Sequence, residues 1–116
     1  MSYESKMIIV NRVEFKTMIA GDVIAEFNLS VLPRKFDHKT VFTTPIDFDL
    51  FPDGNHATME DKYGEHCCMA NIKEVIAAFE ELAAEDDYRR YKPFIALLKG
   101  FDEKQWLDLR VVHYGY

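Results

Sequence analysis

The clearest pattern along the chain is an alternation of apolar and polar side chains between residues 22 and 32. A period of two residues is typical of a strand that buries one face. Residues 12–19 alternate in the same way. Between the two segments, Gly21-Asp22 supplies a Gly-X pair that suits a two-residue turn. The pattern therefore predicts a long β-hairpin with its turn at Gly21-Asp22.

Two further segments show the same alternation. Residues 40–51 predict a third strand, which carries Pro45. Because proline cannot donate a hydrogen bond to a neighbouring strand, we expect this strand at an edge of the sheet or at a bulge. Residues 106–114 predict the last strand, with Leu107, Leu109 and Val111 facing inward.

Two helices are predicted between the third strand and the last. Apolar side chains recur every three or four residues over residues 72–83, which places them on one face of a helix. Asn71 is a good N-cap for this helix, and Glu74 stands in the reciprocal capping position. A second helix is predicted over residues 87–100, where Pro93 marks either a kink or the first turn.

These elements follow one another in the order strand, strand, strand, helix, helix, strand (βββααβ). We predict an α+β fold, in which one antiparallel sheet of about four strands carries two helices packed on one face. With 116 residues, the chain is expected to form a single domain over residues 1–116. Residues 1–6 are expected to be a flexible N-terminal tail.

The charge of the chain bears on its partners and its compartment. The net charge is −6, from 14 basic and 20 acidic residues. This balance argues against binding of duplex nucleic acid, because phosphates require a basic face. Apolar runs fall far short of the roughly 20 residues that span a bilayer, and the N-terminus lacks the pattern of a signal peptide. Two adjacent cysteines do not make the disulfide framework of a secreted protein. We expect a cytoplasmic protein without a membrane partner.

A histidine and two adjacent cysteines, His66, Cys67 and Cys68, stand just ahead of the first predicted helix. A helix N-terminus or a cationic neighbour can lower the pKa of a thiol and make it nucleophilic. With Asn71 as the N-cap, however, Cys68 lies outside the helix, where the effect of the helix dipole is weak. Buried cysteine often acts as a small hydrophobic residue. Core packing is therefore the favoured interpretation, with a reactive thiol as the alternative.

The same three residues, together with His56, are also of the types that bind zinc. Structural zinc sites usually separate paired ligands by two or more residues, so that both ligands reach one ion. Cys67 and Cys68 lack that spacing. Zinc is therefore kept only as an alternative.

An acidic loop raises the separate possibility of calcium. Asp49, Asp53 and Glu60 match the first, fifth and last positions of a 12-residue EF-hand loop. The third position, however, is Phe51, and the preceding segment is predicted to be a strand rather than a helix. We therefore expect no bound metal or cofactor, with a metal site in this loop as the alternative.

Acidic residues are concentrated near the end of the first predicted helix, where residues 80–87 carry five carboxylates. The basic, tyrosine-containing stretch that follows at residues 88–92 is neutralised by these acids, which argues against nucleic-acid binding there. Carboxylates at intervals can instead imitate phosphates and occupy the nucleic-acid groove of a partner protein. The candidate interface residues are Glu74, Glu80, Glu81, Glu85, Asp86 and Asp87.

Aromatic residues make up 14% of the chain, which is enough to fill a core and leave rings at the surface. Aromatic side chains beside charges are typical anchors of protein interfaces. The candidates are Phe36, Phe51, Tyr114 and Tyr116.

The function expected from these patterns is that of a small acidic binding or inhibitory protein. It would act by contact with another protein that has a basic surface, including a nucleic-acid-binding protein that it blocks by mimicking nucleic-acid charge. Scattered histidines and only three serines give no recognisable catalytic triad, so a non-enzyme is favoured. The alternative is a metal- or thiol-dependent enzyme centred on residues 47–68. Either function is compatible with a homo-oligomer.

Overall fold

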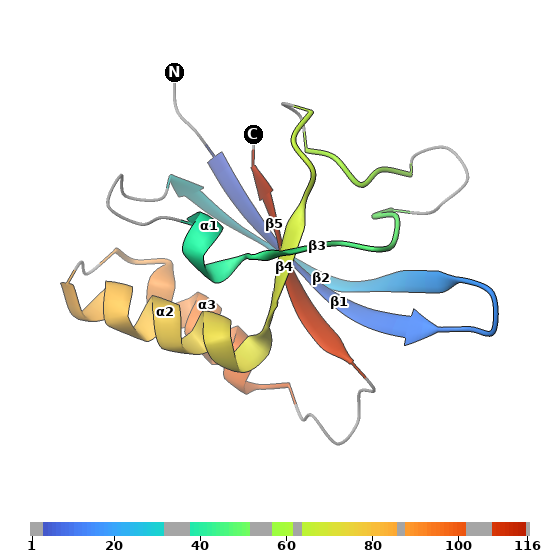
Figure 1. Cartoon of the computed structure of the whole chain (residues 1–116). Coiled ribbons are helices and arrows are strands. Elements are labelled where there is room, and N and C mark those ends of the chain that lie inside the picture. The colour runs from blue at the N-terminus through green and yellow to red at the C-terminus, as the bar shows by residue number, and fades with distance from the viewer. Residues whose placement is uncertain are drawn as a thin grey trace.

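The computed structural model describes residues 4–31, 38–51, 57–61, 64–85, 88–101 and 108–115. These residues form one antiparallel sheet of five strands together with helices (Figure 1). The predicted α+β class is confirmed. In chain order the elements are β1 (Glu4–Glu14), β2 (Ile19–Val31), α1 (His38–Val41), β3 (Thr44–Pro45), β4 (Cys68–Asn71), α2 (Ile72–Glu85), α3 (Tyr91–Lys99) and β5 (Leu109–Gly115).

The strands lie in the order β2-β1-β5-β4-β3, so β1 and β5 are inside the sheet. The run Met7 to Val10 in β1 is fully buried. Met7 and Ile9 join the core cluster that contains the helices, whereas Ile8 and Val10 join a second cluster on the opposite face. An uninterrupted apolar run of this kind is typical of a strand that is covered on both faces.

The first core cluster lies between the sheet and the helices α2 and α3. Ile72, Val75, Phe79 and Leu82 form the buried stripe of α2, as the spacing predicted. The Phe79 ring contacts Phe94 of α3 with centroids 5.0 Å apart in an edge-on arrangement. Figure 1 shows both helices on one side of the sheet and residues 46–51 and 57–61 on the other.

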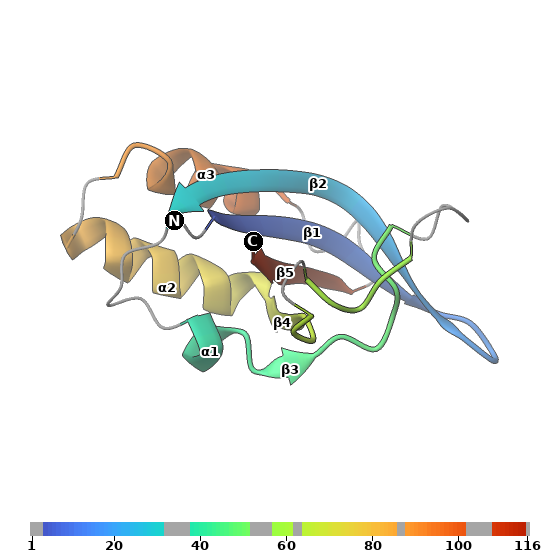
Figure 2. The same cartoon turned by 90° about the horizontal axis from the view of Figure 1, so that it is seen from above.

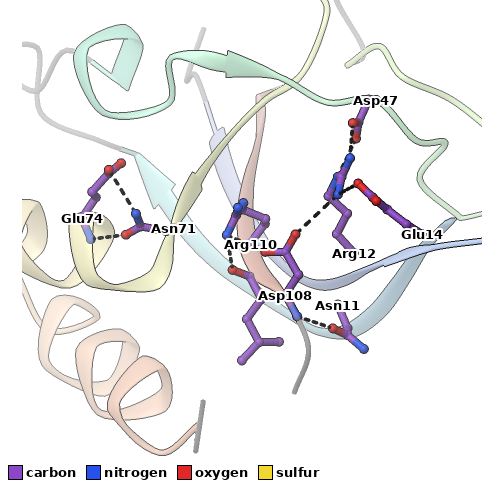
Figure 3. A network of polar contacts seen from close by, with 9 residues as sticks. Asn11, Arg12, Glu14, Asp47, Asn71, Glu74, Asp108 and Arg110 are labelled. Atoms are coloured by element: carbon purple, nitrogen blue, oxygen red, sulfur yellow. Dashed lines mark hydrogen bonds and ion pairs between the residues drawn. The ribbon is translucent and has the colours of Figure 1, made fainter. Parts of the chain in front are cut away.

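The predicted cap of α2 is confirmed. The Glu74 backbone N–H donates to Asn71 Oδ1 at 2.8 Å, and Asn71 Nδ2 donates to Glu74 Oε1 at 3.1 Å (Figure 3). The side chain of Glu74 thus bonds to the cap side chain, whereas in the usual capping box it bonds to the cap backbone. Helix α3 begins at Tyr91, so Pro93 lies in its first turn.

The predicted hairpin is confirmed, but its turn is not at Gly21-Asp22. The turn lies between Phe15 and Met18, where the Phe15 N–H donates to the Met18 carbonyl at 2.8 Å. Gly21 is buried inside β2, and a Cβ at this position would lie 2.3 Å from Cδ2 of Phe48. The glycine therefore permits the close approach of a ring and does not form the turn.

The third strand is much shorter than the predicted residues 40–51. Only β3 pairs with the sheet, and it lies at the edge that Pro45 predicted. Ile46, Phe48 and Leu50 alternate with exposed residues and are buried in the second core cluster. The Ile46 N–H donates to the Cys67 carbonyl, and Leu50 forms an isolated bridge with Thr58, but residues 46–51 form no named strand of the sheet. The period of two places these three side chains against the face of the sheet. Strand β4, which the sequence did not predict, supplies the fifth strand.

The prediction of a flexible N-terminal tail over residues 1–6 is wrong for residues 4–6. Glu4, Ser5 and Lys6 belong to β1, and Ser5 is fully buried. The Ser5 hydroxyl is hydrogen-bonded to Nε2 of His113 on β5 at 3.0 Å, which fixes this end of β1 to the centre of the sheet. Residues 1–3 lie outside the described residues. Within the described part of the chain, no helix has the length and apolar character needed to span a bilayer.

Candidate functional site

The histidine and cysteine side chains singled out in the sequence meet at a cavity of about 380 Å³. His113 also belongs to this group, although the sequence analysis did not include it. The pairing of β4 with β5 places His113 opposite Cys68. The cavity is lined by Phe42, Thr43, Asp61, Glu65, His66, Cys67, Cys68 and His113.

The two thiols face different surroundings. Cys67 is buried in the second core cluster, and Cys68 packs against the first. Burial raises the pKa of Cys67 to about 12, and the negative charges of Asp61 and Glu60 add to this effect. Burial also raises the pKa of Cys68. A raised pKa lowers the thiolate fraction at neutral pH, so neither thiol is activated as a nucleophile.

We expect Cys67 to resist alkylation in the folded protein. Because its pKa is about 12, the folded thiol would carry roughly a thousandfold less thiolate than an ordinary thiol at mildly alkaline pH. Iodoacetamide labelling followed by mass spectrometry, with and without urea, measures this difference at each cysteine. Equal rates of Cys67 labelling in the folded and unfolded protein would contradict the expectation.

The proposed metal ligands that the structure describes are not gathered around one point. Among the described residues, no group of three or more His, Cys, Asp or Glu side chains could hold a metal ion. His66 Nε2 lies 3.0 Å from the Ile46 carbonyl oxygen, to which it donates. Asp49 and Glu60 are exposed. Asp53 and His56 lie outside the described residues.

The described glutamates of the predicted interface all lie on the exposed side of α2. We call Glu74, Glu80, Glu81 and Glu85 the acidic α2 face. Glu74 takes part in the helix cap, and Glu80 pairs with Lys99 of α3 at 2.7 Å. The last turn of α2, which is described in full, contains no basic residue. Asp86 and Asp87 lie outside the described residues.

The aromatic residues predicted for an interface lie either outside the described residues or against the second core cluster. Phe36 and Tyr116 lie outside the described residues. Tyr114 is half-buried and packs against the second core cluster. Its ring meets that of Phe51 edge-on, with centroids 6.5 Å apart. Tyr114 and Phe51 therefore contribute to packing on this face of the sheet.

The sequence analysis missed an apolar surface at the tip of the hairpin. Phe15 is 59% exposed and Met18 is 60% exposed. The alternation of β1 continues through Phe15, so the pattern placed this ring on the same side as buried residues. No sequence signal shows that the hairpin extends past the layers that cover the sheet.

Arg12 fixes the base of this hairpin to two other segments (Figure 3). Its guanidinium donates to both carboxylate oxygens of Asp47, at 3.0 and 2.6 Å, and to Glu14 at 2.7 Å. The hydrogen bond from Arg12 is the main cause that lowers the pKa of Asp47. Asp108, just before β5, lies 3.5 Å from the same guanidinium. A two-pronged arginine–carboxylate pair of this kind fixes geometry as well as charge.

The features of interest in the described chain are thus the cavity at His66, Cys67 and Cys68 and two exposed surfaces, the acidic α2 face and the hairpin tip. His66, Cys67 and Cys68 all line the cavity, but burial raises the pKa of both thiols, and no group of metal-binding side chains is formed among the described residues. Comparisons with protein-family models, with curated proteins and with solved structures found no match to this chain.

Proposed function

We propose that this protein acts by binding another protein that has a basic surface, and that the acidic α2 face makes the contact. One observation carries the proposal. Glu85 stands in the last turn of α2, which contains no basic residue, and Glu81 stands just before that turn. Asp86 and Asp87 follow directly in the sequence.

The placement of these carboxylates is unfavourable for the helix itself. The C-terminal end of a helix carries partial negative charge, so a carboxylate in the last turn costs about 0.3–1 kcal/mol, and the effect is weaker for one further from the end. The ion pair between Glu80 and Lys99 offsets little of this, because both side chains are about half exposed. Residues that oppose a local rule of stability are typical of functional surfaces.

Charge complementarity gives these residues a role in recognition. With a net charge of −6, the protein would attract a basic partner over a distance and approach it faster than a neutral protein would. Where the basic surface of the partner is a nucleic-acid groove, the bound protein would block that groove. An inhibitory function follows in that case. The raised pKa values of both thiols give no support to a thiol-dependent enzyme.

The double variant Glu81→Gln/Glu85→Gln tests the proposal. The wild type and the variant are immobilised and exposed to extract from cells that express the protein, at low and high salt. We expect a basic protein to be retained by the wild type at low salt, and to be lost from the variant and at high salt.

A matched control removes two charges elsewhere. Glu60 and Glu65 are exposed and lie outside α2, so Glu60→Gln/Glu65→Gln should retain the partner. Equal retention by the wild type and the α2 variant, or retention that salt does not weaken, would refute the proposed contact.

A further inference from the structure

The β1–β2 hairpin extends beyond the layers that cover the rest of the sheet. Figures 1 and 2 show its turn at one end of the molecule, with α2 at the other end. Phe15 and Met18, at this turn, are the large apolar side chains of the described chain that stand more than half exposed. Exposed apolar side chains gathered at one point are typical of interaction sites.

Contacts within the chain itself hold the hairpin tip in place. Arg12 ties the hairpin to Asp47 through two hydrogen bonds. The ring of Phe48 lies directly against Gly21 at the base of the same hairpin. Both contacts anchor the hairpin to the segment that covers the second core cluster. A surface that is already ordered loses less conformational entropy on binding.

The charges around the tip indicate the chemistry of its partner. The Glu14 side chain is 65% exposed and that of Asp47 is 42% exposed, whereas the Arg12 side chain that binds them is only 15% exposed. The two carboxylates are thus more exposed than the arginine that binds them, and a partner that approaches the apolar pair would meet Glu14 and Asp47 rather than Arg12. Lys16 is the exposed basic residue within the turn.

A shallow hollow of about 450 Å³ adjoins the tip. Asp47 lies on one side of it, and the turn lies on the other. The hollow is lined by Glu14, Phe15, Lys16, Thr17, Met18, Ile19 and Asp47. A basic side chain at the rim of a partner's groove would fit here, because it would meet Glu14 and Asp47 while the apolar pair enters the groove.

We propose that the hairpin tip is a second docking surface, which inserts Phe15 and Met18 into an apolar groove rimmed by Lys or Arg on another protein. The inference goes beyond the contact made by the acidic α2 face, because the two surfaces lie at opposite ends of the molecule (Figure 1). A second copy of this chain is a poorer occupant, because a tip-to-tip contact would bring the carboxylates of both copies together.

The first step of the test identifies what touches the tip. A photo-crosslinking amino acid replaces the exposed Thr17 in cells that express the protein, and the adduct is identified by mass spectrometry. We expect an adduct with a different protein, formed equally well when Glu81→Gln/Glu85→Gln is also present. An adduct only with a second copy, or no adduct, would overturn the proposal without bearing on the acidic α2 face.

The second step measures affinity for the protein found in the adduct. We expect Phe15→Ser/Met18→Ser to weaken binding at least about tenfold, since large apolar anchors dominate interfaces. Thr17→Lys should weaken binding and Thr17→Glu should not, because the rim of the groove is expected to be basic. Thermal melts of each variant check that it folds. Unchanged affinity of a folded Phe15→Ser/Met18→Ser variant, or tighter binding by Thr17→Lys, would overturn the proposal.

Discussion

Replacing Phe79 with alanine is expected to lower the free energy of unfolding by about 3–5 kcal/mol. The Phe79 side chain is fully buried, and its ring contacts those of Phe94 and Tyr91, with centroids 5.0 and 5.9 Å away. Its removal would leave a cavity where α2, α3 and the sheet meet. Because small domains are stable by only about 5–15 kcal/mol, this change removes a large part of the total. Urea denaturation, followed by circular dichroism, measures it.

The control makes the same substitution at the hairpin tip. Phe15 is 59% exposed, so Phe15→Ala should change the free energy of unfolding by no more than about 0.5 kcal/mol. Similar losses for Phe79→Ala and Phe15→Ala would mean either that the helices are not packed on the sheet as described or that the tip is covered by its own chain.

Replacing Gly21 with alanine is expected to lower the free energy of unfolding by about 1–3 kcal/mol. The added Cβ would lie 2.3 Å from Cδ2 and 2.6 Å from Cε2 of Phe48, so the ring or the strand must move. Because Phe48 is almost completely buried, the ring has little free space. Thermal or urea denaturation of the single variant measures this cost.

A double-mutant cycle shows whether the ring is the cause. Phe48→Leu should reduce the additional cost of Gly21→Ala, because neighbours that clash give non-additive effects. Gly100→Ala is the matched control, since the nearest atom to its added Cβ is 3.4 Å away and its φ of −73° suits alanine. Equal effects at Gly21 and Gly100, or strict additivity with Phe48→Leu, would contradict the described contact.

The parts of the fold that the sequence predicted are those that local chemistry determines. The stripe of α2 and its cap at Asn71 follow from a period of 3.6 residues and from the preference of a side chain for a helix end. Pro45 predicted an edge strand because it lacks an N–H group. The wrong predictions concern features that depend on contacts between distant parts of the chain. The Gly21-Asp22 pair predicts a turn, and only the position of Phe48 shows why a glycine stands there.

The candidate sites divide in the same way. His66, Cys67 and Cys68 stand out in the sequence because they are adjacent, whereas His113 lies beside Cys68 only through the pairing of β4 with β5. The raised pKa values of Cys67 and Cys68 depend on burial, which no local sequence pattern reports. The exposure of Phe15 and Met18 was missed because alternation indicates which side of a strand a residue occupies. It does not indicate where the covering layers end.

The central claim is that the carboxylates at the end of α2 contribute to binding and not to stability. One variant tests both the binding of the partner and the free energy of unfolding. For Glu81→Gln/Glu85→Gln we predict a free energy of unfolding higher by about 0.3–1 kcal/mol, mainly from removal of the Glu85 charge in the last turn, together with loss of the salt-sensitive partner. The control Glu60→Gln/Glu65→Gln should show neither effect. An α2 variant that is less stable than the wild type, or one that retains the partner in full, would contradict the claim.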